Sequence, residues 1–126
     1  MAYSSVKAML IVSRQNNQPL WDVILQSDLL VCGLTRPQSL AEMHHLWQVM
    51  AEALKTAECN ACMTRFVAAP TAGSCGVLPA VLLPLWRSGS YSEEAICRAL
   101  YVSAGFGQVV AARATLAGAE GGCQAE

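Results

Sequence analysis

The sequence predicts an all-α protein, a compact bundle of about five to seven helices in a single domain over residues 1–126. Hydrophobic residues make up 54% of the chain and charged residues 13%, which favours a packed core over disorder. Several segments repeat apolar residues at intervals of three and four, the spacing of a helix, and some follow helix-capping residues. No segment shows the apolar–polar alternation that is typical of a half-buried strand.

The first two predicted helices are short and are separated by a turn. Residues 4–13 carry apolar side chains at helical spacing and predict an amphipathic helix. Residues 15–19 consist of amide side chains and a proline without apolar periodicity, which is typical of a turn. A second helix is expected over residues 20–30, with Cys32 and Gly33 ending it.

Thr35 and Gln38 give the clearest local signal in the chain. Their spacing is that of a capping box, and Pro37 falls in the first turn, where its missing N–H costs little. The residues that follow alternate apolar spacings of three and four, which predicts a helix to about residue 57 with one apolar face. That apolar face consists of Leu40, Met43, Trp47, Met50 and Leu54.

A glycine- and proline-rich loop is expected over residues 68–76, before a buried, proline-bent helix over residues 77–86. Free N–H groups at the start of such a helix suit a carboxylate or a phosphate. Composition alone favours equally a tight turn that lets helices pack closely. The loop is not a nucleotide-binding P-loop, because no Gly-Lys-Ser/Thr follows it.

The last helical region is expected to begin after Ser90 or Ser92, since serine is a good helix cap and acidic residues follow. Gly105 and Gly107 permit either close helix packing or a break in the helix. Residues 108–116 are expected to continue as helix.

Charge and hydropathy exclude several classes of partner. The net charge of −1 and the pI of about 6.1 give no electrostatic reason to expect nucleic acid or an anionic membrane. The apolar run at residues 8–12 is too short for a signal peptide, and no apolar run approaches the ~20 residues of a membrane helix. We therefore expect a cytoplasmic protein whose six cysteines are reduced.

Two side-chain pairs are candidate sites. Cys59 and Cys62 form a CxxC motif, but a structural zinc site needs a second ligand pair, and thioredoxin-like chemistry needs a βαβ unit. Packing is therefore the favoured interpretation. His44 and His45 are adjacent, so on a helix they point about 100° apart and do not easily share a ligand. They are expected to be surface or packing residues.

Two longer motifs point to chemistry. Residues 118–126 read GAEGGCQAE, in which a cysteine follows two glycines and could act as a nucleophile, a metal ligand or a small hydrophobic residue in a turn. Residues 66–82 read FVAAPTAGSCGVLPAVL. Together these motifs closely resemble the α subunit, or catalytic domain, of the iron–sulfur-dependent L-serine dehydratase (L-serine ammonia-lyase) family. The resemblance is strong over residues 58–126 and looser over residues 3–57, and residues 102–107 resemble the family's helix between the two motifs.

The resemblance implies conversion of L-serine to pyruvate and ammonia with a [4Fe–4S] cluster held by three cysteines. Thiolates are the usual cluster ligands, and an iron with an open position can polarise the departing hydroxyl. By resemblance, Cys123 is a cluster ligand, and Pro70, Thr71, Gly73 and Ser74 belong to the loop near the substrate. The family uses no pyridoxal phosphate, and neither lysine of this chain lies in a glycine-rich phosphate context. The proton-abstracting base is not identified.

The chain departs from the family pattern in two places. The other two cluster cysteines normally lie well beyond the GCQ motif, and the sequence stops three residues after Cys123. The glycine-rich segment that family members carry before the PTAGS loop is also missing, since residues 55–57 run directly into Glu58 and Cys59. These departures predict an incomplete α domain that does not hold a full cluster alone.

Three interpretations follow. The chain can belong to a working serine dehydratase as a homo- or hetero-oligomer, with a β subunit or the remaining α segment supplying the missing parts. It can instead be a non-catalytic helical remnant or assembly module of that family. A thiol-based redox protein using Cys59 and Cys62 is the third and weaker alternative.

Overall fold

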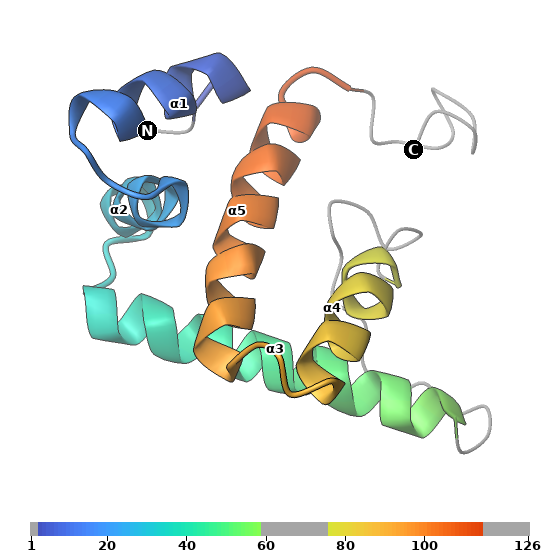
Figure 1. Cartoon of the computed structure of the whole chain (residues 1–126). Coiled ribbons are helices and arrows are strands. Elements are labelled where there is room, and N and C mark those ends of the chain that lie inside the picture. The colour runs from blue at the N-terminus through green and yellow to red at the C-terminus, as the bar shows by residue number, and fades with distance from the viewer. Residues whose placement is uncertain (1–2, 59–75, 115–126) are drawn as a thin grey trace.

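The computed structural model describes residues 3–58 and 76–114, and these residues form five helices without a strand (Figure 1). The expected all-α fold is confirmed, and the described residues alone supply five helices, which lies within the expected range. In chain order the helices are α1 (Val6–Gln15), α2 (Leu20–Cys32), α3 (Arg36–Glu58), α4 (Val77–Arg87) and α5 (Glu93–Ala111).

Helix α5 is the central element of the bundle. It contacts all four other helices, with α1 and α2 packed on one side of it and α4 on the other (Figure 1). The long helix α3 runs beneath α5 and α4 and contacts both of them. The bundle therefore has two sides that share α5 as a common wall.

Local capping fixes most helix ends near the expected positions. Ser5 Oγ accepts a hydrogen bond from the Ala8 N–H at 3.2 Å, so α1 begins two residues later than expected. Gly33, at φ 67°, ends α2 in the left-handed conformation that glycine adopts without strain. Of the two candidate caps for α5, Ser92 is the one used, and its Oγ accepts from the Ala95 N–H.

The capping box predicted before α3 is present in part. The Thr35 N–H donates to Gln38 Oε1 at 2.9 Å, which is the back-bond of the box. The Thr35 hydroxyl donates to the same oxygen at 2.8 Å. The predicted start of α3 is therefore confirmed, and the helix ends at Glu58, one residue beyond the expected position.

Two hydrophobic clusters form the interior. The α3–α4–α5 core contains Trp47 and Met50 from the predicted apolar face of α3, packed against α4 and α5. Its other buried members are Ala51, Leu82, Leu83, Ile96, Cys97 and Leu100. The smaller α1–α2–α5 core consists of Met9, Ile24 and Val109. Each core buries apolar area on one side of α5, which is the main stabilising contribution to such a bundle.

Gly105 of α5 lies in the α1–α2–α5 core, where α2 packs against α5. A Cβ at this position would lie 2.5 Å from Ile24 Cδ1 and 2.9 Å from Ile24 Cγ1, so only glycine lets α2 approach α5 this closely. Of the two roles expected for this glycine, close packing is correct and a break is wrong, because α5 is continuous from Glu93 to Ala111.

The expectation that residues 108–116 are all helical is wrong at the carboxyl end. Helix α5 ends at Ala111, and residues 112–114 turn away. Local composition favours helix there, but Arg113 makes a long-range contact. Its guanidinium donates from Nε and Nη2 to the Ser4 carbonyl at 3.2 and 2.9 Å, which ties the end of α5 to the start of the chain.

Helix α4 is the buried helix expected after the loop, and it buries one face. Pro79, Leu82 and Leu83 point into the bundle, whereas Val77, Val81 and Leu85 are exposed. The exposed residues are four apart and therefore form one apolar stripe along the helix. Within residues 3–58 and 76–114, none of the helices has the length and hydropathy to span a membrane.

A buried polar contact ties three helices together. Ser39 Oγ of α3 donates to Asp28 Oδ2 of α2 at 3.2 Å and lies 2.7 Å from Tyr101 Oη of α5. Because the Ser39 proton is used by Asp28, the Tyr101 hydroxyl donates to Ser39. Burial raises the pKa of Tyr101, and the nearby Asp28 carboxylate acts in the same direction.

Candidate functional site

The predicted site residues lie outside the described residues. Pro70, Thr71, Gly73 and Ser74 fall within 59–75, and Cys123 falls within 115–126, so their placement stays a prediction. The same holds for Cys59 and Cys62. The structure does describe the helices that flank both motifs. Helix α4 begins directly after the PTAGSCG segment, and α5 ends shortly before the GAEGGCQ segment.

A pocket of about 460 Å³ lies where these flanking helices meet. It is formed by the first residues of α4, the carboxyl-terminal half of α5 and the middle of α3. Its lining includes Val77 and Leu78 from α4 and Ala111, the last residue of α5. The other lining residues are Met43, Leu46, Met50, Leu100, Ser103, Ala104, Phe106, Gly107, Gln108 and Val110. We call this space the motif pocket.

The motif pocket is mainly apolar and contains a few polar groups. Ser103 and Gln108 are the polar side chains of its lining, and the Ser103 hydroxyl donates to the Ala99 carbonyl at 2.9 Å. Gly76, the residue before α4, has no side chain with which to cap the first turn of the helix. The loop expected to present helix N–H groups to a carboxylate lies, up to residue 75, outside the described residues, so that role stays a prediction. Small-molecule sites commonly combine an apolar wall with such convergent polar groups.

Neither described cysteine resembles a cluster ligand. Cys97 is buried in the α3–α4–α5 core, and burial raises its pKa to about 11, so the thiol stays protonated near neutral pH. Cys32 is exposed, and a hydrogen bond to Asp28 raises the pKa of its thiol. Within the described part of the chain, no group of three histidine, cysteine or acidic side chains could hold a metal ion.

The two adjacent histidines behave as expected for surface and packing residues. His44 Nδ1 of α3 lies 2.9 Å from Glu93 Oε1 at the start of α5. His45 is exposed. The sequence interpretation missed Ser103 and Gln108 as pocket residues. Their position inside a helix gives no local signal, because only the packing of α5 against α3 and α4 puts them beside a cavity.

Comparison with known proteins assigns the chain to a family. The family model for the serine dehydratase alpha chain matches residues 4–126. The L-serine dehydratase alpha chain of Peptoniphilus asaccharolyticus is 48% identical over 81 residues, and a probable L-serine dehydratase alpha chain of Latilactobacillus sakei is 44% identical over 79 residues. A third relative, from Bacillus subtilis, is 43% identical over 77 residues.

These matches cover much of this chain and a smaller part of each relative. The aligned residues make up 64%, 63% and 61% of this chain, but 28%, 38% and 26% of the three relatives. No solved structure matches. Because the family model extends over nearly all residues and the described fold is all-α, the chain belongs to the serine dehydratase alpha chain family.

Proposed function

We propose that this chain is part of an L-serine ammonia-lyase, which converts L-serine to pyruvate and ammonia by iron–sulfur-assisted dehydration. The match of the family model over residues 4–126 carries the proposal. Of the three relatives named above, one is named an L-serine dehydratase alpha chain and two are named probable L-serine dehydratase alpha chains. These names support the same reaction class. Since the chain spans about a quarter to two fifths of their lengths, we infer that it is inactive alone.

The motif pocket supports the choice of substrate site. It is bordered by the start of α4, which follows the PTAGSCG segment, and by the end of α5, which precedes the GAEGGCQ segment. We assign Pro70, Thr71, Gly73 and Ser74 to binding of L-serine and Cys123 to iron. The amino-terminal N–H groups of α4 then suit the substrate carboxylate.

The described residues do not by themselves fit a [4Fe–4S] cluster. Cys97 is closed within the core and Cys32 is hydrogen-bonded to Asp28, so neither offers a ready thiolate. We therefore assign no reaction step to the cluster and propose that further ligands come from a β subunit or the remaining α segment. A cytoplasmic hetero- or homo-oligomer is the assembly that this proposal requires.

Anaerobic reconstitution with iron and sulfide tests the proposal. The chain is reconstituted alone and with a polypeptide that supplies the rest of an alpha chain, and iron content and pyruvate formed from L-serine are measured. We expect stable cluster absorbance and pyruvate in the combined sample only. Loss of both in Cys123→Ala, with Cys32→Ala unaffected as a matched control, would support Cys123 as a ligand.

A second set of variants separates substrate binding from cluster binding. Ser74→Ala is expected to raise KM for L-serine while leaving iron content unchanged, because the hydroxyl is assigned to the substrate loop. Full iron content and full activity in this variant would contradict that role. A folded helical chain that takes up no iron in any combination would instead favour a non-catalytic remnant or assembly module.

A further inference from the structure

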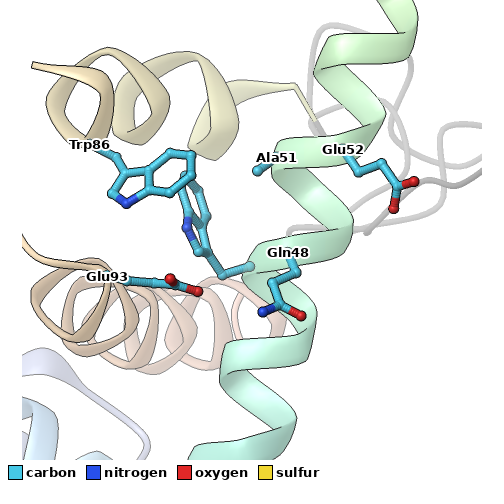
Figure 2. Close-up of a pocket in the computed structure, with 6 residues that line it drawn as sticks. Gln48, Ala51, Glu52, Trp86 and Glu93 are labelled. Carbon is cyan, nitrogen blue, oxygen red and sulfur yellow. The ribbon is translucent and has the colours of Figure 1, made fainter.

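Helix α4 is apolar on both of its faces. Its inner face packs into the α3–α4–α5 core through Leu82 and Leu83. At its end, the Trp86 ring meets the Trp47 ring edge to face, with centroids 5.8 Å apart. Figure 2 shows Trp86 on the inner side of α4, where it lines a pocket of about 430 Å³ together with residues of α3 and α5. The inner side of α4 is therefore already covered by this chain.

The outer face of α4 is exposed and equally apolar. Its exposed residues recur at the three- and four-residue intervals of a helix face that packs against another element. They are Val77, Ala80, Val81, Pro84 and Leu85. Val77 and Val81 are 58% and 57% exposed, and residues 77–85 contain no polar side chain. A helix that is apolar all round is typical of one that is covered on all sides.

The exposed face of α3 has the opposite character. Its exposed residues include Glu42, His45, Gln48 and Glu52, which are polar and spaced by three or four. Figure 2 shows two of them, Gln48 and Glu52, with the Glu52 carboxylate extending away from α4. Helix α3 thus follows the ordinary pattern of a surface helix, with polar residues outward. The apolar outer face of α4 is therefore a local feature of the bundle.

This apolar surface continues onto α5 beside the motif pocket. Phe106 and Val110 are 43% and 46% exposed, and both line the motif pocket together with Val77. Residues 102–111 of α5 contain no charged side chain. We call the exposed α4 residues given above, together with Phe106 and Val110, the α4–α5 apolar face. Contiguous exposed apolar surfaces of this kind mark sites of contact with another polypeptide.

The relatives indicate what covers this face. The aligned stretch amounts to 28%, 38% and 26% of the three relatives, so most of each alpha chain lies outside it. Permanent contacts are more hydrophobic than transient ones and resemble a domain core cut in two. The absence of charge on the α4–α5 apolar face fits a contact of that kind and gives a nucleic acid or a charged partner nothing to recognise.

We propose that the α4–α5 apolar face is the docking surface for the rest of an alpha chain, the part that lies outside the stretch aligned with this chain. Docking buries the outer side of α4 and places the added segment at the border of the motif pocket, next to Val77 and Phe106. This inference rests on the proposed function, which assigns the missing parts of the site to a further segment, and it names the surface that receives that segment.

Co-expression tests the proposal. The full chain, with an affinity tag, is produced together with the part of the Peptoniphilus asaccharolyticus alpha chain that lies outside the aligned stretch. Size-exclusion chromatography with light scattering measures the mass of the purified product. We expect a one-to-one complex, and the methyl NMR signals of Val81 and Leu85 should shift relative to the chain alone. The methyl signals of Leu30, which is 82% exposed on α2 and outside the face, should stay unchanged.

Charged variants locate the contact. Val81→Glu and Leu85→Glu each put a carboxylate into the contact, and burial of an unpaired charge is costly, so the amount of bound partner should fall at least about tenfold. Val81→Leu keeps an apolar side chain and should bind as the wild type does. Leu30→Glu is the matched control and should also bind normally. Circular dichroism of each variant shows that the helices are retained.

The same complex, loaded with iron and sulfide, separates this inference from the proposed function. A complex that Val81→Glu disrupts, without pyruvate formation from L-serine, would support the docking surface and contradict the reaction. Pyruvate formation that Val81→Glu and Leu85→Glu leave unchanged would support the reaction and overturn the docking surface.

Two further outcomes would overturn the docking surface by pointing to another occupant. A dimer of this chain alone that Val81→Glu dissociates would show that a second copy covers the face. A wild-type chain that stays monomeric and binds no added segment would show that the face needs no such partner.

Discussion

On one side of α5, Gly105 lies so close to Ile24 that a single added carbon would collide, whereas on the other side Gly107 borders a pocket of about 460 Å³. The two glycines are two residues apart on one helix and face different surroundings. Among the described residues, the α1–α2–α5 side packs tightly at the Gly105–Ile24 contact, and the α3–α4–α5 side combines a buried core with pockets beside it. Helix α5 therefore packs closely against α2 on one face and borders a pocket on the other.

The largest expected effect comes from Trp47→Ala. The Trp47 ring is the largest fully buried side chain and lies between α3, α4 and α5, so its loss should cost ~3–5 kcal/mol of unfolding free energy. Urea denaturation followed by circular dichroism measures the change. Trp21→Ala is the matched control, because that ring is half-buried beside Arg36 and Arg98 and should cost about 1 kcal/mol. Equal losses of unfolding free energy in the two variants would mean that the α3–α4–α5 core is not tightly packed around Trp47.

The contrast between the two glycines is tested directly by Gly105→Val and Gly107→Ala. Valine at position 105 overlaps Ile24 and should destabilise the protein by ~1–3 kcal/mol. Alanine at position 107 meets no neighbouring atom within 4 Å, so its better helix propensity should stabilise by ~0.5–1 kcal/mol. The melting temperature should move in opposite directions, and Ile24→Val should recover part of the loss in Gly105→Val. If both variants shifted the melting temperature in the same direction, the inferred difference in packing around Gly105 and Gly107 would be wrong.

The polar contact that joins α2, α3 and α5 should contribute less. Tyr101→Phe removes the hydroxyl that donates to Ser39 but keeps the ring, so the expected cost is ~0.5–1.5 kcal/mol. Tyr91→Phe is the control, because Tyr91 is exposed and its hydroxyl should contribute almost nothing. Indistinguishable unfolding curves for the two variants would show that the buried bond adds no stability.

The smallest effect concerns alkaline pH and Cys97. Burial raises the pKa of this thiol from 9.0 to about 11, so the folded state keeps its proton where the unfolded state has lost it. The stability that this thiol contributes is therefore complete below pH 9 and is lost as the pH rises toward 11. Unfolding free energies across that range should fall less steeply in Cys97→Ala. The exposed Cys32→Ala is the control, and identical slopes for wild type and Cys97→Ala would contradict the prediction.

Much of the fold could be predicted because its signals are local. Thr35 and Gln38 predicted the start of α3, and the spacing of Met43, Trp47 and Met50 predicted the face that packs in the core. The candidate site was less accessible to such reasoning. The substrate loop and Cys123 came from motif resemblance and stay predictions, whereas Ser103, Gln108 and Trp86 became pocket residues only through packing.

The sequence by itself determined the all-α class, the approximate helix boundaries and the family. These depend on the periodicity of apolar residues, on helix-capping residues and on the order of motifs along the chain. The tertiary structure decided that Gly105 serves a close contact with Ile24, that α5 ends at Ala111, and where pockets remain between the described helices. These features depend on residues that are far apart in sequence, such as Gly105 with Ile24 and Arg113 with Ser4. Such contacts depend on how the helices pack together, which local periodicity does not encode.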